Sequence, residues 1–153
     1  MRGFTLIEAI IVTALLSLLV SMASFALLQP QATASVEAAA FTLVSDIKSQ
    51  QLRVMTGDGG SQGPFGIHFA QDRYILFQGQ QFQASDQNNF AVALDSGMRF
   101  INITWPNEEL IFAKRSGEVL NFTDSQNTIT VVHIGTGEQQ TITVNRFGAI
   151  SIN

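Results

Sequence analysis

The feature that most constrains this chain is a run of twenty uncharged residues, Ala9 to Leu28, near the N-terminus. Sixteen of them are Ala, Val, Ile, Leu, Met or Phe. A helix of this length extends about 30 Å, which is the thickness of a bilayer core. The run also exceeds the roughly 7–15 apolar residues of a secretory signal peptide. The sequence therefore predicts a membrane helix, and Arg2, the only basic residue before it, favours a cytoplasmic N-terminus.

Four small hydroxyl side chains interrupt the apolar run, namely Thr13, Ser17, Ser21 and Ser24. They recur every three or four residues, so a helix places them on one face. A stripe of this kind allows helices to approach closely in lipid, with hydroxyls bonding across the contact. Alternatively, each hydroxyl bonds a carbonyl of its own helix. The sequence leaves both interpretations open.

One carboxylate, Glu8, stands at the head of the run. At the centre of a bilayer a carboxylate costs about 3 kcal/mol on insertion scales, so its presence needs a reason. Either Glu8 reaches back to the headgroup region at the end of the helix, or it is kept for a cation on a partner.

The segment Met1-Arg2-Gly3-Phe4-Thr5-Leu6-Ile7-Glu8, followed by the apolar run, resembles the start of type IV prepilins and type II secretion pseudopilins. This resemblance implies that a membrane aspartyl peptidase cuts between Gly3 and Phe4 and methylates the new amine of Phe4. It also implies that Glu8 of one subunit neutralises the Phe4 amine of its neighbour in a filament. Two such charges attract strongly in a low-dielectric helix bundle, and either one alone is costly there.

A competing interpretation concerns Ala32-Thr33-Ala34, which resembles a signal-peptidase site and would release the chain from Ser35 onward. The length of the run, the embedded Glu8 and the very short leader argue against it.

The rest of the chain predicts an α+β fold. Residues 36–55 repeat apolar side chains at helical spacing, so one long helix should carry a membrane half and an amphipathic half that covers antiparallel β-sheet. The following residues show strand patterns separated by turns, at 65–69, 73–78, 90–94, 99–105, 109–113, 118–122, 128–134, 140–145 and 149–152. The resulting division is a leader (1–3), a transmembrane and assembly half of the helix (4–28), its amphipathic half (29–56) and a β-rich globular domain (57–153).

The C-terminal half adds a second resemblance. Leu110-Ile111-Phe112, Lys114-Arg115-Ser116-Gly117 and the closing Gly148-Ala149-Ile150 are similar to the GspH/FimT type of minor pilin domain. That resemblance implies a pilin-like fold with two β-sheets and the role of a minor subunit. Major pilins and major pseudopilins are the competing assignments.

Little in the domain predicts chemistry, and we expect no catalytic residue, cofactor or metal site. The chain lacks cysteine, which excludes disulfides and thiol chemistry. His68 and His133 lie in strand patterns and are expected to be structural or exposed. The pair Glu108-Glu109 follows Pro106 and is expected in a solvated turn. Trp105 is expected in the core rather than at an interface.

These features together predict an assembly subunit rather than an enzyme. The expected partners are other pilins or pseudopilins, a prepilin peptidase and an inner-membrane assembly platform. The expected location is the bacterial inner membrane, crossed once with the C-terminal domain outside the cytoplasm, and then a periplasmic or extracellular filament. A DNA- or surface-binding minor pilin is the alternative, but the net charge of −4 and the lack of a basic run disfavour nucleic acid.

Overall fold

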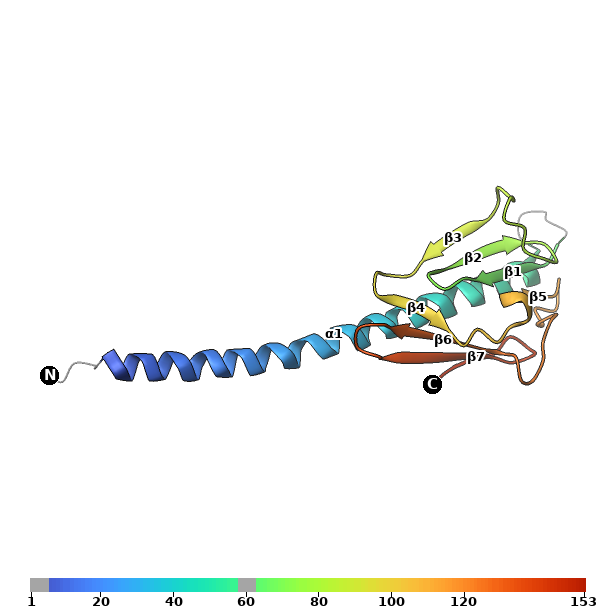
Figure 1. The fold of residues 1–153 in the computed structure, drawn as a ribbon. Coiled ribbons are helices and arrows are strands. Elements are labelled where there is room, and N and C mark those ends of the chain that lie inside the picture. The colour runs from blue at the N-terminus through green and yellow to red at the C-terminus, as the bar shows by residue number, and fades with distance from the viewer. Residues whose placement is uncertain (1–5, 58–62) are drawn as a thin grey trace.

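The computed structural model describes residues 6–57 and 63–153, and for residues 22–35 it describes the backbone without the side chains. Within these residues one long helix, α1 (Leu6–Thr56), precedes eight short strands in two four-stranded sheets. Figure 1 shows that the C-terminal part of α1 lies along the sheets, whereas its N-terminal part extends away from them. This arrangement confirms the predicted α+β, pilin-like fold class.

Both sheets are antiparallel throughout. The first has the order β3-β2-β1-β5, with β1 (Phe65–Phe69), β2 (Arg73–Gln78), β3 (Phe90–Ala93) and β5 (Glu109–Phe112). The second has the order β4-β6-β7-β8, with β4 (Met98–Ile101), β6 (Thr128–His133), β7 (Gln139–Val144) and β8 (Ile150–Ile152). A short 3₁₀ turn, η2 (Pro106–Glu108), leads into β5.

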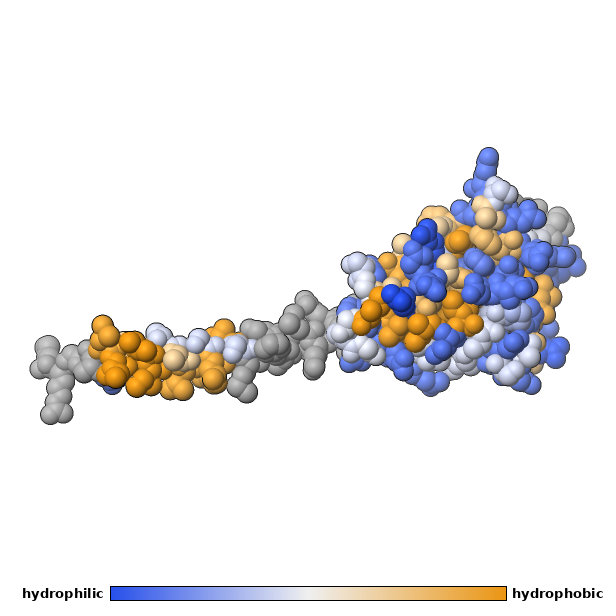
Figure 2. All heavy atoms as spheres, in the orientation of Figure 1, coloured by the Kyte–Doolittle hydropathy of each residue, from blue (hydrophilic) through white to orange (hydrophobic). Residues whose placement is uncertain are grey.

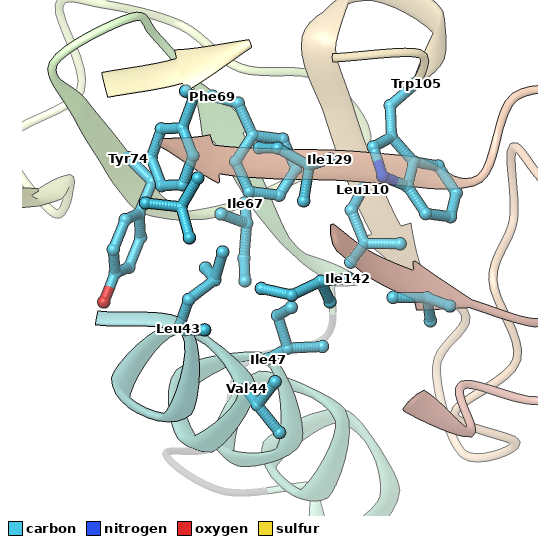
Figure 3. Packing of buried hydrophobic residues seen from close by; sticks show 14 of the residues in the cluster. Leu43, Val44, Ile47, Ile67, Phe69, Tyr74, Trp105, Leu110, Ile129 and Ile142 are labelled. Carbon is cyan, nitrogen blue, oxygen red and sulfur yellow. The ribbon is translucent and has the colours of Figure 1, made fainter. Parts of the chain in front are cut away.

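The core lies between the second half of α1 and the inner faces of both sheets. The apolar stripe of the helix is buried, and its members are Val36, Ala40, Leu43, Val44, Ile47 and Val54. Opposite it lie strand residues that alternate inward, and Figure 3 shows Ile67, Ile129 and Ile142 pointing toward Leu43 and Ile47. The helix packs against β1 and β5 of one sheet and β6 and β7 of the other, so it joins the two sheets into one domain.

Two predicted strands differ from the structure. The strand expected at 99–105 ends at Ile101, because Asn102 has a φ of 51°, which breaks an extended backbone. The strand expected at 118–122 is wrong: only Val119 forms a bridge, to Phe112. There the side chain of Asn121 replaces ladder pairing, since its amide donates to the carbonyl of Glu109 and its oxygen accepts from the N–H of Ile111.

Two polar side chains of α1 fasten the helix to the sheets. Tyr74 of β2 is buried, and its hydroxyl donates to the carboxylate of Asp46. Nearer the helix end, the amide nitrogen of Gln51 donates to the carbonyl oxygens of Gly117 and Phe147, each at 2.9 Å. These two carbonyls belong to turns far apart in sequence, so Gln51 holds both turns against α1.

Gly148 makes the Gln51 contact possible, which gives a testable prediction. Its φ is +76°, and an added Cβ would lie 2.2 Å from the amide nitrogen of Gln51. Gly137 has the same φ, but nothing lies within 4 Å of its added Cβ. Both Gly→Ala variants should lose roughly 1–2 kcal/mol from the left-handed backbone. Gly148→Ala should lose about 1 kcal/mol more, because it displaces Gln51.

Urea unfolding of residues 29–153 measures this difference, since that fragment keeps the buried residues that form the described core. Equal losses for Gly148→Ala and Gly137→Ala would show that the Gln51 contact contributes nothing to stability.

Candidate assembly segment

The N-terminal part of α1 presents apolar side chains to its surroundings. From Leu6 to Ser21 every side chain is exposed, and Leu6 reaches 81%. Figure 2 shows this part of the helix as mostly apolar, with paler side chains along its upper edge, whereas the surface of the domain is mixed. Each square ångström of apolar area left in water costs about 25 cal/mol, so this segment requires apolar surroundings.

Glu8 lies in the first turn of α1. A carboxylate is favourable there because the N-terminal end of a helix carries a partial positive charge. Gly3 and Phe4, the predicted cleavage position, lie outside the described residues. Cleavage between them and the pairing of Glu8 with a Phe4 amine therefore stay predictions.

The hydroxyls of the predicted stripe bond within their own helix. The hydroxyl oxygen of Thr13 lies 2.9 Å from the carbonyl of Ala9, Ser17 donates to Ala14 at 2.8 Å, and Ser21 donates to Leu18 at 2.8 Å. Each oxygen still has lone pairs that accept a donor from a neighbouring helix. Ser24 belongs to residues 22–35, for which the structure does not describe side chains. Contact between stripes of neighbouring subunits stays a prediction.

Among the residues that the structure describes, no helix combines the length and the apolar character needed to cross a membrane. The same part of the chain contains no cluster of three or more His, Asp or Glu that could hold a metal ion. The predicted span, Ala9 to Leu28, continues past Ser21 into residues whose side chains are not described.

The position of Glu109 shows that one prediction from the sequence is wrong. It was expected in a solvated turn with Glu108, but it begins β5 and is only 6% exposed. It lies opposite His68 in the register of β1 and β5, on the face of the sheet away from the core. Phe82 folds over this pair: its ring stacks on His68 at 4.2 Å, and its N–H donates to the Glu109 carboxylate at 3.3 Å. The loop after β2 therefore closes this face.

The other residues considered for chemistry, Trp105, His133 and His68, are buried or half-buried in the domain. Trp105 is 3% exposed, which confirms the prediction that it lies in the core. His133 ends β6, half-buried, and its Nδ1 accepts from the N–H of Thr136 at 3.2 Å. The hydroxyl oxygen of Thr136 also lies 3.2 Å from the same ring nitrogen, within the turn that follows β6. His68 is half-buried under Phe82.

Two turns that carry basic residues of the C-terminal half lie together at the end of α1. Lys114 and Arg115 lie in the turn that ends at Gly117, and Arg146 lies in the turn that contains Phe147. Gln51 bonds both turns, and the N–H of Val119 donates to the carbonyl of Arg146 at 2.8 Å. Arg115 and Arg146 are exposed. This juxtaposition was not predicted from the sequence, although the adjacent Gln50 and Gln51, which interrupt the apolar stripe, signalled a polar contact at this point.

Comparison with known families finds one match. Residues 1–24 match the prokaryotic N-terminal methylation motif. The match supports a type IV pilin-like protein that a prepilin peptidase processes and that assembles with other pilins, first anchored to a membrane and then in a filament. It favours a structural subunit over an enzyme. No curated protein and no solved structure matches the chain.

Proposed function

We propose that this chain is a minor pilin or pseudopilin, a structural subunit of a type II secretion pseudopilus or a type IV pilus. The observation that carries the proposal is the methylation motif at residues 1–24. The motif runs directly into a helix segment with an exposed apolar surface, and the same helix then forms the core of an α+β domain. In this proposal the domain lies outside the cytoplasm of a bacterium while the N-terminal helix is held in the inner membrane.

Assembly then rests on packing. The exposed apolar part of α1 leaves the membrane by entering a bundle of like helices, where its apolar area stays buried. One repeated contact between copies or related subunits generates a helical filament. Glu8 and the amine of Phe4 supply a charge pair that fixes the register of neighbouring helices. The inner-membrane platform would deliver subunits to the base of the filament.

Processing is tested by the intact mass of protein extracted from membranes. We expect a chain of residues 4–153 carrying one methyl group, because the proposed cut leaves Phe4 at the N-terminus. The Gly3→Val variant is the control and should keep its leader, since the resemblance assigns peptidase recognition to Gly3. A chain that begins at Ser35 would show that a signal peptidase cuts instead.

The alternative function, a DNA-binding minor pilin, is favoured by one observation: the turn with Lys114 and Arg115 and the turn with Arg146 lie together at the end of α1. Charge argues against it. Removal of residues 1–28 takes away Arg2 and Glu8 and leaves a net charge of −4. Phosphate binding draws on clustered cations and weakens steeply with salt.

We therefore expect no mobility shift of double- or single-stranded DNA by residues 29–153 at physiological salt. The comparison is with the double variant Lys114→Ala and Arg115→Ala. Micromolar binding by the parent fragment that disappears in the double variant would favour the DNA-binding alternative.

A further inference from the structure

The outer edge of β3 is an unpaired sheet edge in the part of the chain that the structure describes. Figure 1 shows β3 at the outer margin of the first sheet. The N–H of Leu94 donates to the carbonyl of Asp72 at 2.9 Å. Because hydrogen-bonded pairs alternate along an antiparallel ladder, Ala91 and Ala93 direct their N–H and C=O groups away from β2. An exposed apolar edge of this kind is a template for another strand.

Two hollows lie between this edge and α1. The first, of about 170 Å³, is mostly apolar, and its lining includes Ala38, Ala39 and Thr42 of α1 with Val92 and Leu94. The second, of about 410 Å³, is more polar, and its lining includes Gln50 and Arg53 of α1 with Leu76, Gln78, Asn88 and Phe90. A strand added beside β3 would have side chains on one face directed toward α1, where these hollows lie.

The second hollow has groups suited to an acidic peptide. The guanidinium of Arg53 lies 4.4 Å from the centre of the Phe65 ring, and no described carboxylate forms an ion pair with it. Gln50 is 1% exposed, and its Oε1 has no hydrogen-bond partner among the described residues. A cation attracts a carboxylate, and an unpaired buried acceptor favours a ligand that brings N–H donors.

We propose that the outer edge of β3 receives an extended segment of another protein as an added antiparallel strand, with an apolar side chain in the first hollow and an acidic one in the second. The unpaired backbone groups of Ala91 and Ala93 supply main-chain pairing, and the hollows supply selectivity. Antiparallel addition continues the pattern of the existing sheet.

The spacing of the hollows defines the segment. Of the residues that line them, Phe90 and Ala93 of β3 are about 10 Å apart along the strand, and Thr42 and Arg53 of α1 are about 17 Å apart along the helix. Two side chains four residues apart on one face of a strand span about 13 Å, which lies between these values. Since the added strand runs against β3, it meets the apolar hollow first and the acidic residue follows four positions later.

The test uses the full chain in detergent micelles and a fluorescent synthetic peptide, Ser-Thr-Ser-Leu-Thr-Val-Thr-Glu-Thr-Ser. Fluorescence anisotropy should give a dissociation constant below about 1 mM. The same peptide with Lys in place of Glu should bind at least about tenfold more weakly, and a scrambled peptide should behave likewise.

Variants locate the binding. Ala91→Pro removes an N–H that points away from β2, and Pro is tolerated at such an edge. It should weaken binding by at least about tenfold, whereas Ala91→Val keeps the N–H and should change binding little. Arg53→Gln should abolish the difference in affinity between the Glu peptide and the Lys peptide. This variant provides a separate test in case Ala91→Pro does not fold. The proposal is overturned if the Glu peptide does not bind below about 1 mM, if a folded Ala91→Pro variant binds equally, or if Arg53→Gln keeps the preference.

Discussion

Glu8→Leu is expected to leave membrane insertion and leader cleavage intact and to abolish entry into filaments. Insertion should not suffer, because a carboxylate costs about 3 kcal/mol at the bilayer centre and Leu costs nothing there. Cleavage should continue, because the prepilin resemblance places recognition at Gly3. Assembly should fail, because the Phe4 amine of a neighbour would be left without a counter-charge in an apolar bundle. Such an uncompensated buried charge costs about 3–5 kcal/mol, which is at least about a hundredfold in incorporation.

The measurement is the amount of each variant in sheared filaments relative to its amount in membranes. Glu8→Gln keeps the shape of the side chain and removes its charge, so it should fail as Glu8→Leu does. Glu8→Asp keeps the charge and should retain part of the incorporation. If the processed Glu8→Leu protein enters filaments as well as the parent, the carboxylate only reaches the headgroup region and the pairing mechanism is wrong.

The domain is expected to lose stability steeply above pH 10 through one side chain, Tyr74. Burial and the hydrogen bond to Asp46 raise the pKa of the Tyr74 hydroxyl well above its ordinary value of 10.0. The unfolded chain ionises this hydroxyl near pH 10, whereas the folded chain keeps it protonated. The unfolded state therefore binds fewer protons above pH 10, and the free energy of unfolding falls there by about 1.4 kcal/mol for each pH unit. Below pH 10 this contribution is fully present.

Tyr74 is the only tyrosine of the chain, so tyrosinate absorbance reports this one hydroxyl. In residues 29–153 the absorbance should rise together with loss of the circular dichroism signal, since ionisation accompanies unfolding. Tyr74→Phe is the matched variant: at pH 7 it should lose about 2 kcal/mol, because the half-buried Asp46 carboxylate loses its donor. Above pH 10 its stability should decline less steeply than that of the parent. Tyrosinate formation near pH 10 in a fully folded domain would contradict this account.

The fold class could be predicted because its signals are local. The apolar stripe from Val36 to Val54 repeats at helical spacing, and each of its members is buried where the stripe predicts. The hairpin of β6 and β7 follows from alternating Thr and apolar residues around Gly135 and Gly137. In both cases the pattern lies within one segment, so neighbours in sequence are sufficient to reveal it.

The contacts that escaped prediction join distant segments. Glu109 is a charged residue beside a proline turn, and its burial depends on a loop whose Phe82 lies far away in sequence. Asp46 and Gln51 are polar residues on a helix, a position usually solvated, yet each bonds a group in the sheets or their turns. Residue type alone does not identify such partners, because the pairing is created by the fold.

The N-terminal part of α1 likewise has one feature that the sequence reveals and one that it does not. The methylation motif at residues 1–24 could be identified from the sequence because the order of residues along the chain defines it. The role of the Thr and Ser stripe could not be identified in this way. The hydroxyls of Thr13, Ser17 and Ser21 bond carbonyls of α1 itself, and only a partner helix would show a contact between subunits.

The unbroken helix α1 also determines how a mechanical load would pass through this protein. The helix is 51 residues long, and the domain core grips it from Val36 onward. Tension on the N-terminal half therefore acts along the helix axis and would slide α1 past the sheets. The buried side chains resist this sliding together, so the load is shared among them. At the end of α1 farthest from the pull, Gln51 donates to two turn carbonyls, and the carbonyl of Val54 accepts from the N–H of Arg115 at 3.1 Å. The chain has no cysteine to cross-link helix and sheets, so this packing and these hydrogen bonds set the strength of the subunit under tension.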